Sequence, residues 1–180
     1  LMATGAWKPG KLDIEGNVQG VIEWMKRMKK QVKPCLSGNI VVVGAGNTAM
    51  DAARVAKRMG AASSTIVYRR TKKEMPADEH ELKLAIDEGV NLVELAAPVE
   101  QKDGKLICNQ MKLGEPDASG RRRPIPVEGS NFEIPVDTVI MSLGTSPNPL
   151  IRTTTEGLEA NKKGCLVADE HMATTREGVY

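Results

Sequence analysis

The segment with the clearest chemical meaning is a glycine-rich turn between a β-branched run and a helical pattern. The run Ile40–Val43 leads directly into Gly44-Ala45-Gly46-Asn47-Thr48-Ala49. This is GxGxxA spacing: Gly44 permits a tight turn, Gly46 lets a pyrophosphate approach the backbone, and Ala49 allows close helix packing. The helix N-terminus offers free N–H groups to phosphates. The pattern predicts dinucleotide binding, with a structural turn or another nucleotide ligand, such as S-adenosylmethionine, as alternatives; the P-loop pattern GxxxxGK[ST] is absent.

The end of the next β-branched run favours NADP(H) over NAD(H). In an NAD site, an acidic residue about 20 positions beyond the glycine loop binds the ribose 2′-hydroxyl. Tyr68 stands near that position, and four basic residues follow it: Arg69, Arg70, Lys72 and Lys73. A carboxylate would repel a 2′-phosphate, whereas guanidinium groups bind one through charge-assisted hydrogen bonds. The same feature counts against a methyltransferase. A solvated basic turn is the alternative.

Two other motifs do not fit the chemistry that they suggest. Tyr68 and Lys72 form the YxxxK pair of short-chain dehydrogenases, but here the pair follows a strand rather than lying on a helix far downstream. Glu79-His80-Glu81 cannot converge on a metal ion, because adjacent residues of a helix point to different faces. The sequence therefore indicates no metal site, and we name no catalytic residue.

Composition limits the class of protein. The chain has 180 residues, of which 41% are hydrophobic and 27% charged, and its net charge is +2. These values are typical of a folded domain, with or without an appendage, and do not indicate a nucleic-acid partner. No apolar run approaches the roughly 18 residues of a membrane span. Cys35, Cys108 and Cys165 form no CxxC pair, so reduced thiols and a cytoplasmic location are the simplest interpretation.

Periodicity predicts an α/β fold. Helices are expected over 18–33, 47–60 and 78–89, and buried-type strands over 39–43, 65–68, 91–95 and 137–143. Alternation of strands and helices predicts a parallel sheet. Turn signals between short apolar pieces predict an antiparallel β-meander over 96–135. We therefore expect a Rossmann-like, three-layer ββα arrangement, with helices on one face of the sheet and the meander on the other. Residues 145–164 are turn-rich, and Cys165–Val167 is a last short strand candidate.

Three runs carry a resemblance to a known family. They are Val42–Arg54, Val67-Tyr68-Arg69-Arg70 and Glu74-Met75-Pro76-Ala77. The chain closely resembles the small (beta) subunit of NADPH-dependent glutamate synthase and related FAD/NAD(P) oxidoreductases, including ferredoxin–NADP oxidoreductase subunits. In that family an NADPH domain is inserted into an FAD domain.

The resemblance implies the domain organisation. Residues 1–17 would be a stub and exit loop of an FAD domain, 18–147 the NAD(P)H-binding domain, and 148–180 the return stub. The apolar opening at Leu1–Gly5 and the ending at Gly178-Val179-Tyr180 also suggest a segment of a larger protein. The family's FAD-binding glycine loop and final Gly-Gly-Asp have no counterpart here. We therefore expect FAD to be bound by the full-length parent and not by this segment.

The resemblance also implies the site and its partners. Cofactor contacts would come from the backbone of Gly46, Asn47 and Thr48 and from the side chains of Arg69 and Arg70. Lys73 is a candidate third phosphate contact, and Gly144 and Thr145 fall near the nicotinamide end. The parent would pass hydride from NADPH to FAD, and electrons onward through iron–sulfur clusters to a large synthase subunit or another acceptor protein. A module that only senses the NADP(H) redox state is the competing hypothesis.

Overall fold

The computed structural model describes residues 2, 5–10, 12–118 and 120–180. The chain divides into two compact units. The larger is Lys11–Leu143, and the smaller combines Leu1–Gly10 with Gly144–Tyr180. Leu1, Ala3 and Thr4, which belong to the apolar opening of the sequence, lie outside the described residues. The domain bounds expected from the sequence stay a prediction.

The larger unit is built on a five-stranded parallel sheet. Its order is β2-β9-β3-β4-β5, and every neighbouring pair is parallel. The strands are β2 (Val18–Gly20), β3 (Asn39–Val43), β4 (Ser63–Val67), β5 (Asn91–Val93) and β9 (Thr138–Met141). The chain proceeds from β3 to β4 and β5 on one side, while β9 and β2 lie on the other. The carboxyl end of β3 is therefore a topological switch point, where ligands of open α/β sheets bind.

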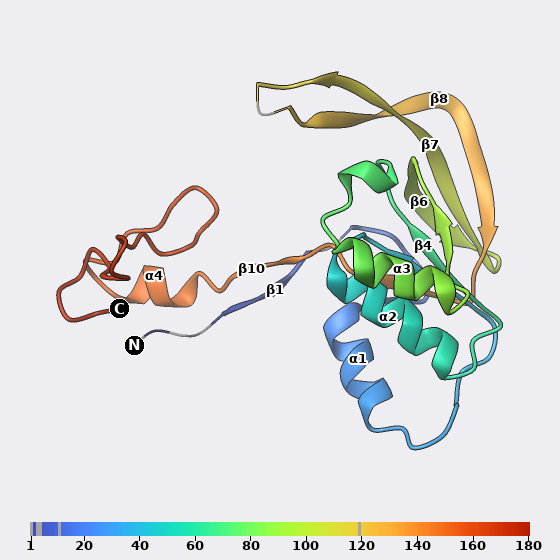
Figure 1. Cartoon of the computed structure of the whole chain (residues 1–180), viewed down its shortest axis with the longest axis horizontal. Helices are drawn as coiled ribbons and strands as arrows, with labels where there is room; N and C mark the ends of the chain where they lie inside the picture. Colours follow the sequence, from blue (N-terminus) through green and yellow to red (C-terminus); the bar gives the residue numbers. More distant parts are fainter. Residues whose placement is uncertain (1, 3–4, 11, 119) are drawn as a thin grey trace. The chain divides into compact units, whose positions relative to one another are not determined.

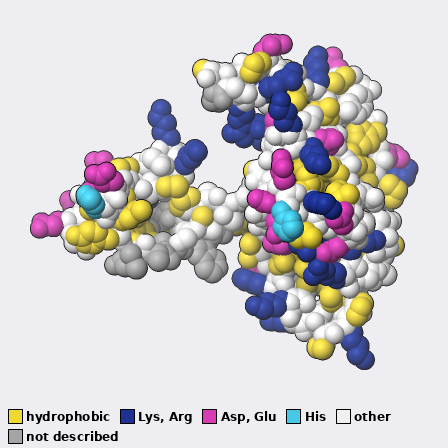
Figure 2. Space-filling view, in the orientation of Figure 1, with side chains coloured by type: hydrophobic (Ala, Val, Ile, Leu, Met, Phe, Trp, Pro, Cys, Tyr) yellow, Lys and Arg dark blue, Asp and Glu magenta, His cyan; other side chains and the backbone are white. Residues whose placement is uncertain are grey.

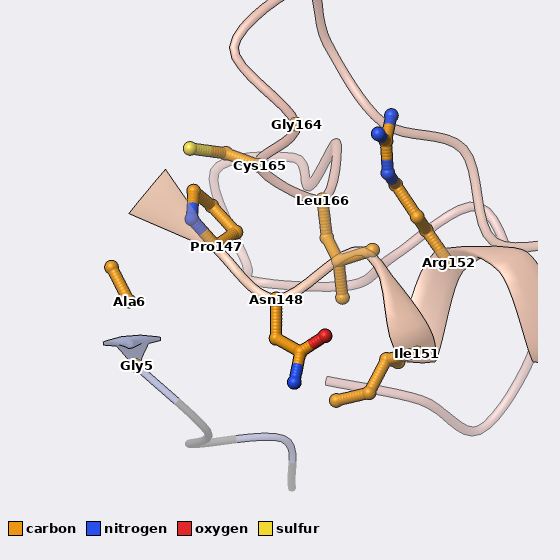
Figure 3. Close-up of a pocket in the computed structure, with 9 residues that line it drawn as sticks. All are labelled: Gly5, Ala6, Pro147, Asn148, Ile151, Arg152, Gly164, Cys165 and Leu166. Carbon is orange, nitrogen blue, oxygen red and sulfur yellow. The ribbon is translucent and has the colours of Figure 1, made fainter. Parts of the chain in front are cut away.

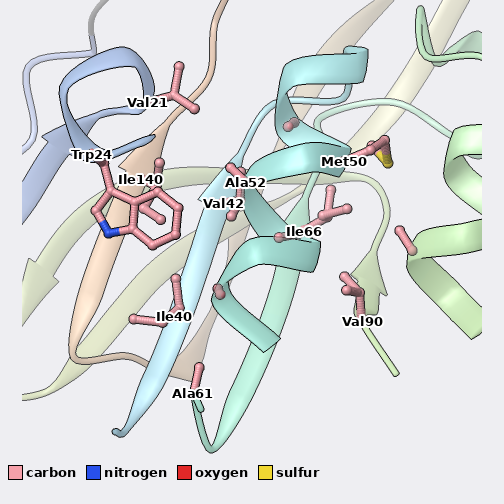
Figure 4. Close-up of a cluster of buried hydrophobic side chains, with 14 of the residues drawn as sticks. Val21, Trp24, Ile40, Val42, Met50, Ala52, Ala61, Ile66, Val90 and Ile140 are labelled. Atoms are coloured by element: carbon pink, nitrogen blue, oxygen red, sulfur yellow. The ribbon is translucent and has the colours of Figure 1, made fainter. Parts of the chain in front are cut away.

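Helices cover one face of this sheet. They are α1 (Val21–Lys29), α2 (Asn47–Arg58) and α3 (Glu79–Asp87). Figure 4 shows α2 lying against β3 and β4, with Val42 and Ile66 beneath it. Four alanines of α2 have no exposed surface: Ala49, Ala52, Ala53 and Ala56. Such small side chains let the helix approach the sheet closely, as Ala49 of the GxGxxA spacing predicted.

The antiparallel meander packs on the other face. It consists of β6 (Ala96–Lys102), β7 (Lys105–Pro116) and β8 (Arg122–Pro135), paired in that order. Leu106 and Cys108 of β7 are fully buried in a cluster with Val41 and Val139 of the parallel sheet. Alternate residues of β3 thus contact opposite layers. The helix, sheet and meander layers visible in Figure 1 confirm the expected fold class.

Three local predictions were wrong. Residues 18–20 form the edge strand β2 rather than the first turn of a helix, because they pair with Val139, Ile140 and Met141 of β9. Three residues are too few for a periodicity to distinguish strand from helix. Cys165–Val167 forms no strand; only an isolated bridge joins Ala160 to Leu166. The region 145–164, expected to be turns, contains two short elements, β10 (Thr145–Pro147) and α4 (Leu150–Thr154).

The smaller unit is held by a short antiparallel pair. Strand β1 (Ala6–Pro9) pairs with β10, and Gly10 N donates to Gly144 O over 2.8 Å. Helix α4 follows, and two isolated bridges organise the segment after it. No helix in the described part of the chain is long and apolar enough to cross a membrane.

An ion-pair network between α2 and α3 centres on Glu88. Its carboxylate accepts hydrogen bonds from Arg58 Nε (2.9 Å) and Arg54 Nε (3.0 Å), and these bonds lower the pKa of Glu88 to about 2. Because the folded-state pKa lies below the usual 4.5, this stabilisation should be complete above about pH 4.5 and lost as the pH falls toward 2.

Urea unfolding of wild type and Glu88→Gln checks this dependence. The variant should be less stable near neutral pH. The difference should shrink at about pH 3, because the carboxylate of the unfolded chain, with its ordinary pKa of 4.5, is protonated there while that of the folded chain is still largely ionised. Asp87→Asn, on the exposed pair with Lys83, is the matched control and should change little at either pH. An equal deficit for Glu88→Gln at both pH values would contradict the assignment.

Candidate functional site

The first glycine of the loop is required by the backbone. Gly44 has φ +133°, and a Cβ there would lie 2.1 Å from the carbonyl oxygen of Ser142. Gly44 N donates to Val67 O over 3.1 Å, and Ser142 N donates to Val43 O over 2.8 Å. The loop is thus fixed between the ends of β4 and β9, so a side chain at position 44 would push these strand ends apart.

The second glycine leaves space above the helix terminus. Gly46 is the N-cap of α2, with extended backbone (φ −89°, ψ 173°), and a Cβ there would meet nothing within 4 Å. Asn47 and Thr48 are exposed, and the first turn of α2 carries no acidic residue. No contact within the described part of the chain therefore requires glycine at position 46. In a GxGxxA loop this position gives a pyrophosphate access to the backbone, and a helix N-terminus favours negative charge.

The turn before α3 is attached to the glycine loop. Ala77 N donates to Ala45 O over 3.0 Å, and Asp78 N donates to Asn47 Oδ1 over 2.8 Å. Asp78 in turn accepts from His80 N as the N-cap of α3. The side chain of Asn47 is therefore engaged within the protein, which leaves its backbone N–H as the group for a phosphate.

The two arginines after β4 have different surroundings. Arg69 is exposed, and its guanidinium pairs with no carboxylate of the described residues. Arg70 is only 8% exposed, and its buried Nε has no hydrogen-bond partner in the described part of the chain. A buried unpartnered donor is costly, and no described residue compensates for it. The exposed, unpaired guanidinium of Arg69 is the one of the two that is accessible to a nucleotide phosphate at the end of β4.

A short capped turn follows the arginines. Thr71 and Glu74 form a reciprocal capping box around η1 (Lys72–Glu74), and Tyr68 OH donates to Glu74 O over 2.8 Å. The hydrogen bond from Thr71 Oγ1 is the main cause of the lowered pKa of Glu74. Lys72 N donates to a carboxylate oxygen of Glu94. Glu74 and Glu94 thus already accept hydrogen bonds within the protein, while Lys73 remains exposed on the turn.

The structure brings most of the predicted site residues into one unit. The glycine loop (Gly44, Gly46, Asn47, Thr48, Ala49) and the basic turn (Arg69, Arg70, Lys73) follow neighbouring parallel strands, β3 and β4. Gly144 and Thr145 belong to the smaller unit, where Gly144 has φ +81° and Thr145 pairs with Pro9. Their place near the nicotinamide stays a prediction.

Sequence reasoning missed the residues that support the site. Ser142 limits the space at Gly44, and Glu94 fixes the turn after the arginines. Neither carries a sequence signal, because both act from elements far away in the chain. Cys108 is buried, and burial raises the pKa of its thiol to about 12, so it is not a reactive thiolate.

A separate cavity lies within the smaller unit. It has a volume of about 270 Å³ and is shown in Figure 3. Its lining consists of small and apolar residues with a single cation and a single amide: Gly5, Ala6, Pro147, Asn148, Ile151, Arg152, Gly164, Cys165 and Leu166. None of the predicted cofactor-binding residues lines it, and we assign it no ligand.

The parallel sheet, the open glycine loop at its switch point and the basic turn after β4 define a Rossmann-type dinucleotide-binding protein. Comparison with known proteins then identifies the family to which the chain belongs. The sequence pattern of the pyridine nucleotide-disulphide oxidoreductase family matches residues 1–180, and the chain belongs to that family.

Curated relatives include oxidoreductase subunits. A putative glutamate synthase [NADPH] small chain of Cereibacter sphaeroides is 41% identical over 201 residues, covering 100% of this chain and 48% of that protein. The NADPH-Fe(3+) oxidoreductase subunit beta of Geobacter sulfurreducens is 41% identical over 162 residues, covering 82% of this chain and 24% of that protein. The chain thus spans less than half the length of these relatives. They confirm the resemblance to glutamate synthase small subunits and related oxidoreductases.

Solved structures share the fold. Mycobacterium tuberculosis FprA in complex with NADPH matches with a TM-score of 0.69 at 18% identity, over 88% of this chain and 51% of that one. Thioredoxin reductase of T. acidophilum matches with a TM-score of 0.67 at 16% identity, over 98% and 54% of the two chains. These similarities confirm the Rossmann-type fold of FAD/NAD(P) oxidoreductases.

Proposed function

We propose that the chain is the NADPH-binding domain of a flavin-dependent oxidoreductase of the glutamate synthase small-subunit type. The observation that carries this proposal is Arg69, an exposed arginine without an acidic partner among the described residues. It follows β4, which pairs with β3, the strand that leads into the open glycine loop. Charge-assisted hydrogen bonds from a guanidinium suit a 2′-phosphate, and no carboxylate occupies the position that would select a free ribose hydroxyl.

In this proposal the chain binds and orients the nucleotide. The N-terminus of α2, at Gly46, Asn47 and Thr48, holds the pyrophosphate, while Arg69, Arg70 and Lys73 hold the 2′-phosphate. Gly144 and Thr145 would border the nicotinamide. The flavin of the parent protein supplies the hydride acceptor. Hydride transfer between stacked rings depends on positioning, so the domain needs no side-chain acid or base.

The acceptor beyond the flavin has several candidates. Relatives at similar identity are named as a glutamate synthase small chain, an NADPH-Fe(3+) oxidoreductase subunit and, at 36%, an NADP(+)-dependent formate dehydrogenase subunit beta of Moorella thermoacetica. We therefore propose a partner subunit that accepts electrons, and name glutamate synthesis and ferredoxin reduction as the two leading roles. A cytoplasmic location fits the three free cysteines.

The flavin should not bind to this chain alone. The sequence contains a single GxGxxA loop, and in this proposal that loop binds NADPH. The purified chain should therefore be colourless, and it should not reduce an artificial electron acceptor with NADPH until an FAD-containing polypeptide is supplied. Visible absorbance after incubation with FAD checks this. A yellow protein with stoichiometric flavin would overturn the assignment of FAD to the rest of the parent protein.

A further inference from the structure

The outer half of the β7–β8 hairpin extends beyond the third strand of the meander. Strand β6 pairs with β7 only as far as Gln110, opposite Ala96. Beyond it, residues 111–116 pair with 122–126 alone, from Met111↔Pro126 to Pro116↔Arg122. We call residues 111–126 the outer hairpin. An isolated two-stranded ribbon is only marginally stable in water. Forming a sheet therefore does not by itself explain why the outer hairpin is so long.

Arg122 holds a fixed position on the outer hairpin. Its Nε donates to Gly114 O over 2.9 Å and its terminal nitrogen donates to Leu113 O over 3.4 Å, both on the facing strand. A guanidinium carries five N–H groups in a planar arrangement. Two carbonyls therefore orient the side chain, while the remaining N–H groups stay available. Arg122 is exposed and pairs with no carboxylate within 4 Å among the described residues.

The outer hairpin lies on the same side of the larger unit as the basic turn. In Figure 1 it is drawn above the segment between β4 and α3, and the positive charge of Arg122 contributes to the lowered pKa of Glu74, after the larger effect of the hydrogen bond from Thr71. The turn η1 directly follows Arg69 and Arg70 in the chain. In Figure 2, Lys and Arg side chains gather over this region of the larger unit.

The charges around this region favour an anion. Glu74 is engaged by Thr71, and Glu94 accepts from the backbone N–H of Lys72. Lys72, Lys73 and Arg122 are exposed, and so are the neighbours Arg121 and Arg123. Exposed cations thus occur both on the turn after β4 and on the outer hairpin of the meander.

We propose that Arg122 is a further specificity-determining residue, which contacts the 2′-phosphate of NADP(H) from the meander while Arg69 contacts it from the parallel sheet. This inference rests on the proposed function. In this proposal, basic side chains of the outer hairpin cover the adenosine end of the nucleotide. The bonds to Gly114 and Leu113 orient the guanidinium before the nucleotide arrives, which reduces the entropy lost on binding.

The test compares NADP⁺ with NAD⁺, which differ only in the 2′-phosphate. Arg122→Gln should weaken NADP⁺ binding by about tenfold, as one charge-assisted hydrogen bond predicts, and leave NAD⁺ binding unchanged. Lys102→Gln is the matched control, because it removes one exposed positive charge at the opposite end of the meander. Arg122→Lys should restore part of the affinity, and circular dichroism should show that all variants fold.

The outcomes separate the inference from the proposed function. Wild type that prefers NADP⁺, with Arg122→Gln unchanged in this preference, would overturn the role of Arg122 alone. An equal loss in Lys102→Gln would also overturn it, because a general charge effect would then explain the result. Wild type that binds NADP⁺ and NAD⁺ equally would instead overturn the proposed function itself.

Discussion

Gly44→Ala is expected to destabilise the larger unit by about 2–5 kcal/mol and to abolish dinucleotide binding. The φ of +133° is a backbone conformation that costs an L-residue roughly 1–2 kcal/mol, and displacing packed atoms typically costs a further 1–3 kcal/mol. Here the displaced atom is the carbonyl oxygen of Ser142, 2.1 Å from the new Cβ. Backbone cannot move aside as a flexible side chain can. Urea unfolding and titration calorimetry measure the two effects.

Gly46→Ala is the matched control for this result. It adds the same methyl group two residues along the same loop, at φ −89° and into open space. We expect stability within about 1 kcal/mol of wild type, since the new side chain strains nothing in the protein. NADPH binding should nevertheless weaken at least roughly tenfold, because the methyl group occupies the space for the pyrophosphate. Equal destabilisation by both substitutions would contradict the difference between the two glycines.

Arg69→Ala is expected to remove most of the preference for NADPH over NADH. The exposed guanidinium forms no ion pair with the described carboxylates, so its removal costs the fold little. Charge-assisted hydrogen bonds contribute roughly 1.5–3 kcal/mol each, reduced by solvent and salt. Affinity for NADPH should fall on the order of 10- to 100-fold, while affinity for NADH should remain nearly constant.

Arg70→Ala should behave differently, which distinguishes the two arginines. Arg70 is only 8% exposed, so truncation leaves a cavity as well as removing charge. We expect a loss of stability together with a loss of NADPH affinity. Thermal unfolding in parallel with calorimetry separates these effects. If Arg69→Ala lowered stability as much as Arg70→Ala, the basic turn would be serving the fold rather than the nucleotide.

Local sequence patterns were sufficient to predict the parts of the fold that depend on neighbouring residues. The run Ile40–Val43 and the helical pattern over 47–60 predicted a buried strand and the helix that follows it, because both patterns follow from periodicity. The glycine spacing predicted the loop, since a tight turn and a close backbone approach require residues without Cβ. The switch from helical crossovers to turn-punctuated strands predicted the meander.

Features that depend on through-space contacts could not be predicted. The three residues of β2 pair with β9, more than a hundred residues away in the chain, and carry too short a pattern to reveal it. Arg70 is buried and Arg69 exposed although both belong to the same basic run, so composition alone does not distinguish them. Arg122 lies within the region predicted as the meander. Its place on the outer hairpin, opposite Pro116, follows only from the strand register.

The central claim is that this chain binds NADPH through the open glycine loop and the basic turn after β4. The most direct test is titration calorimetry of the unmutated chain with NADPH and NADH, at low and at high salt. We predict tighter binding of NADPH by on the order of 10- to 1,000-fold, with a preference that decreases at high salt as exposed charges are screened. Equal affinity for the two nucleotides at low salt would contradict the claim and leave the basic run as a solvated turn.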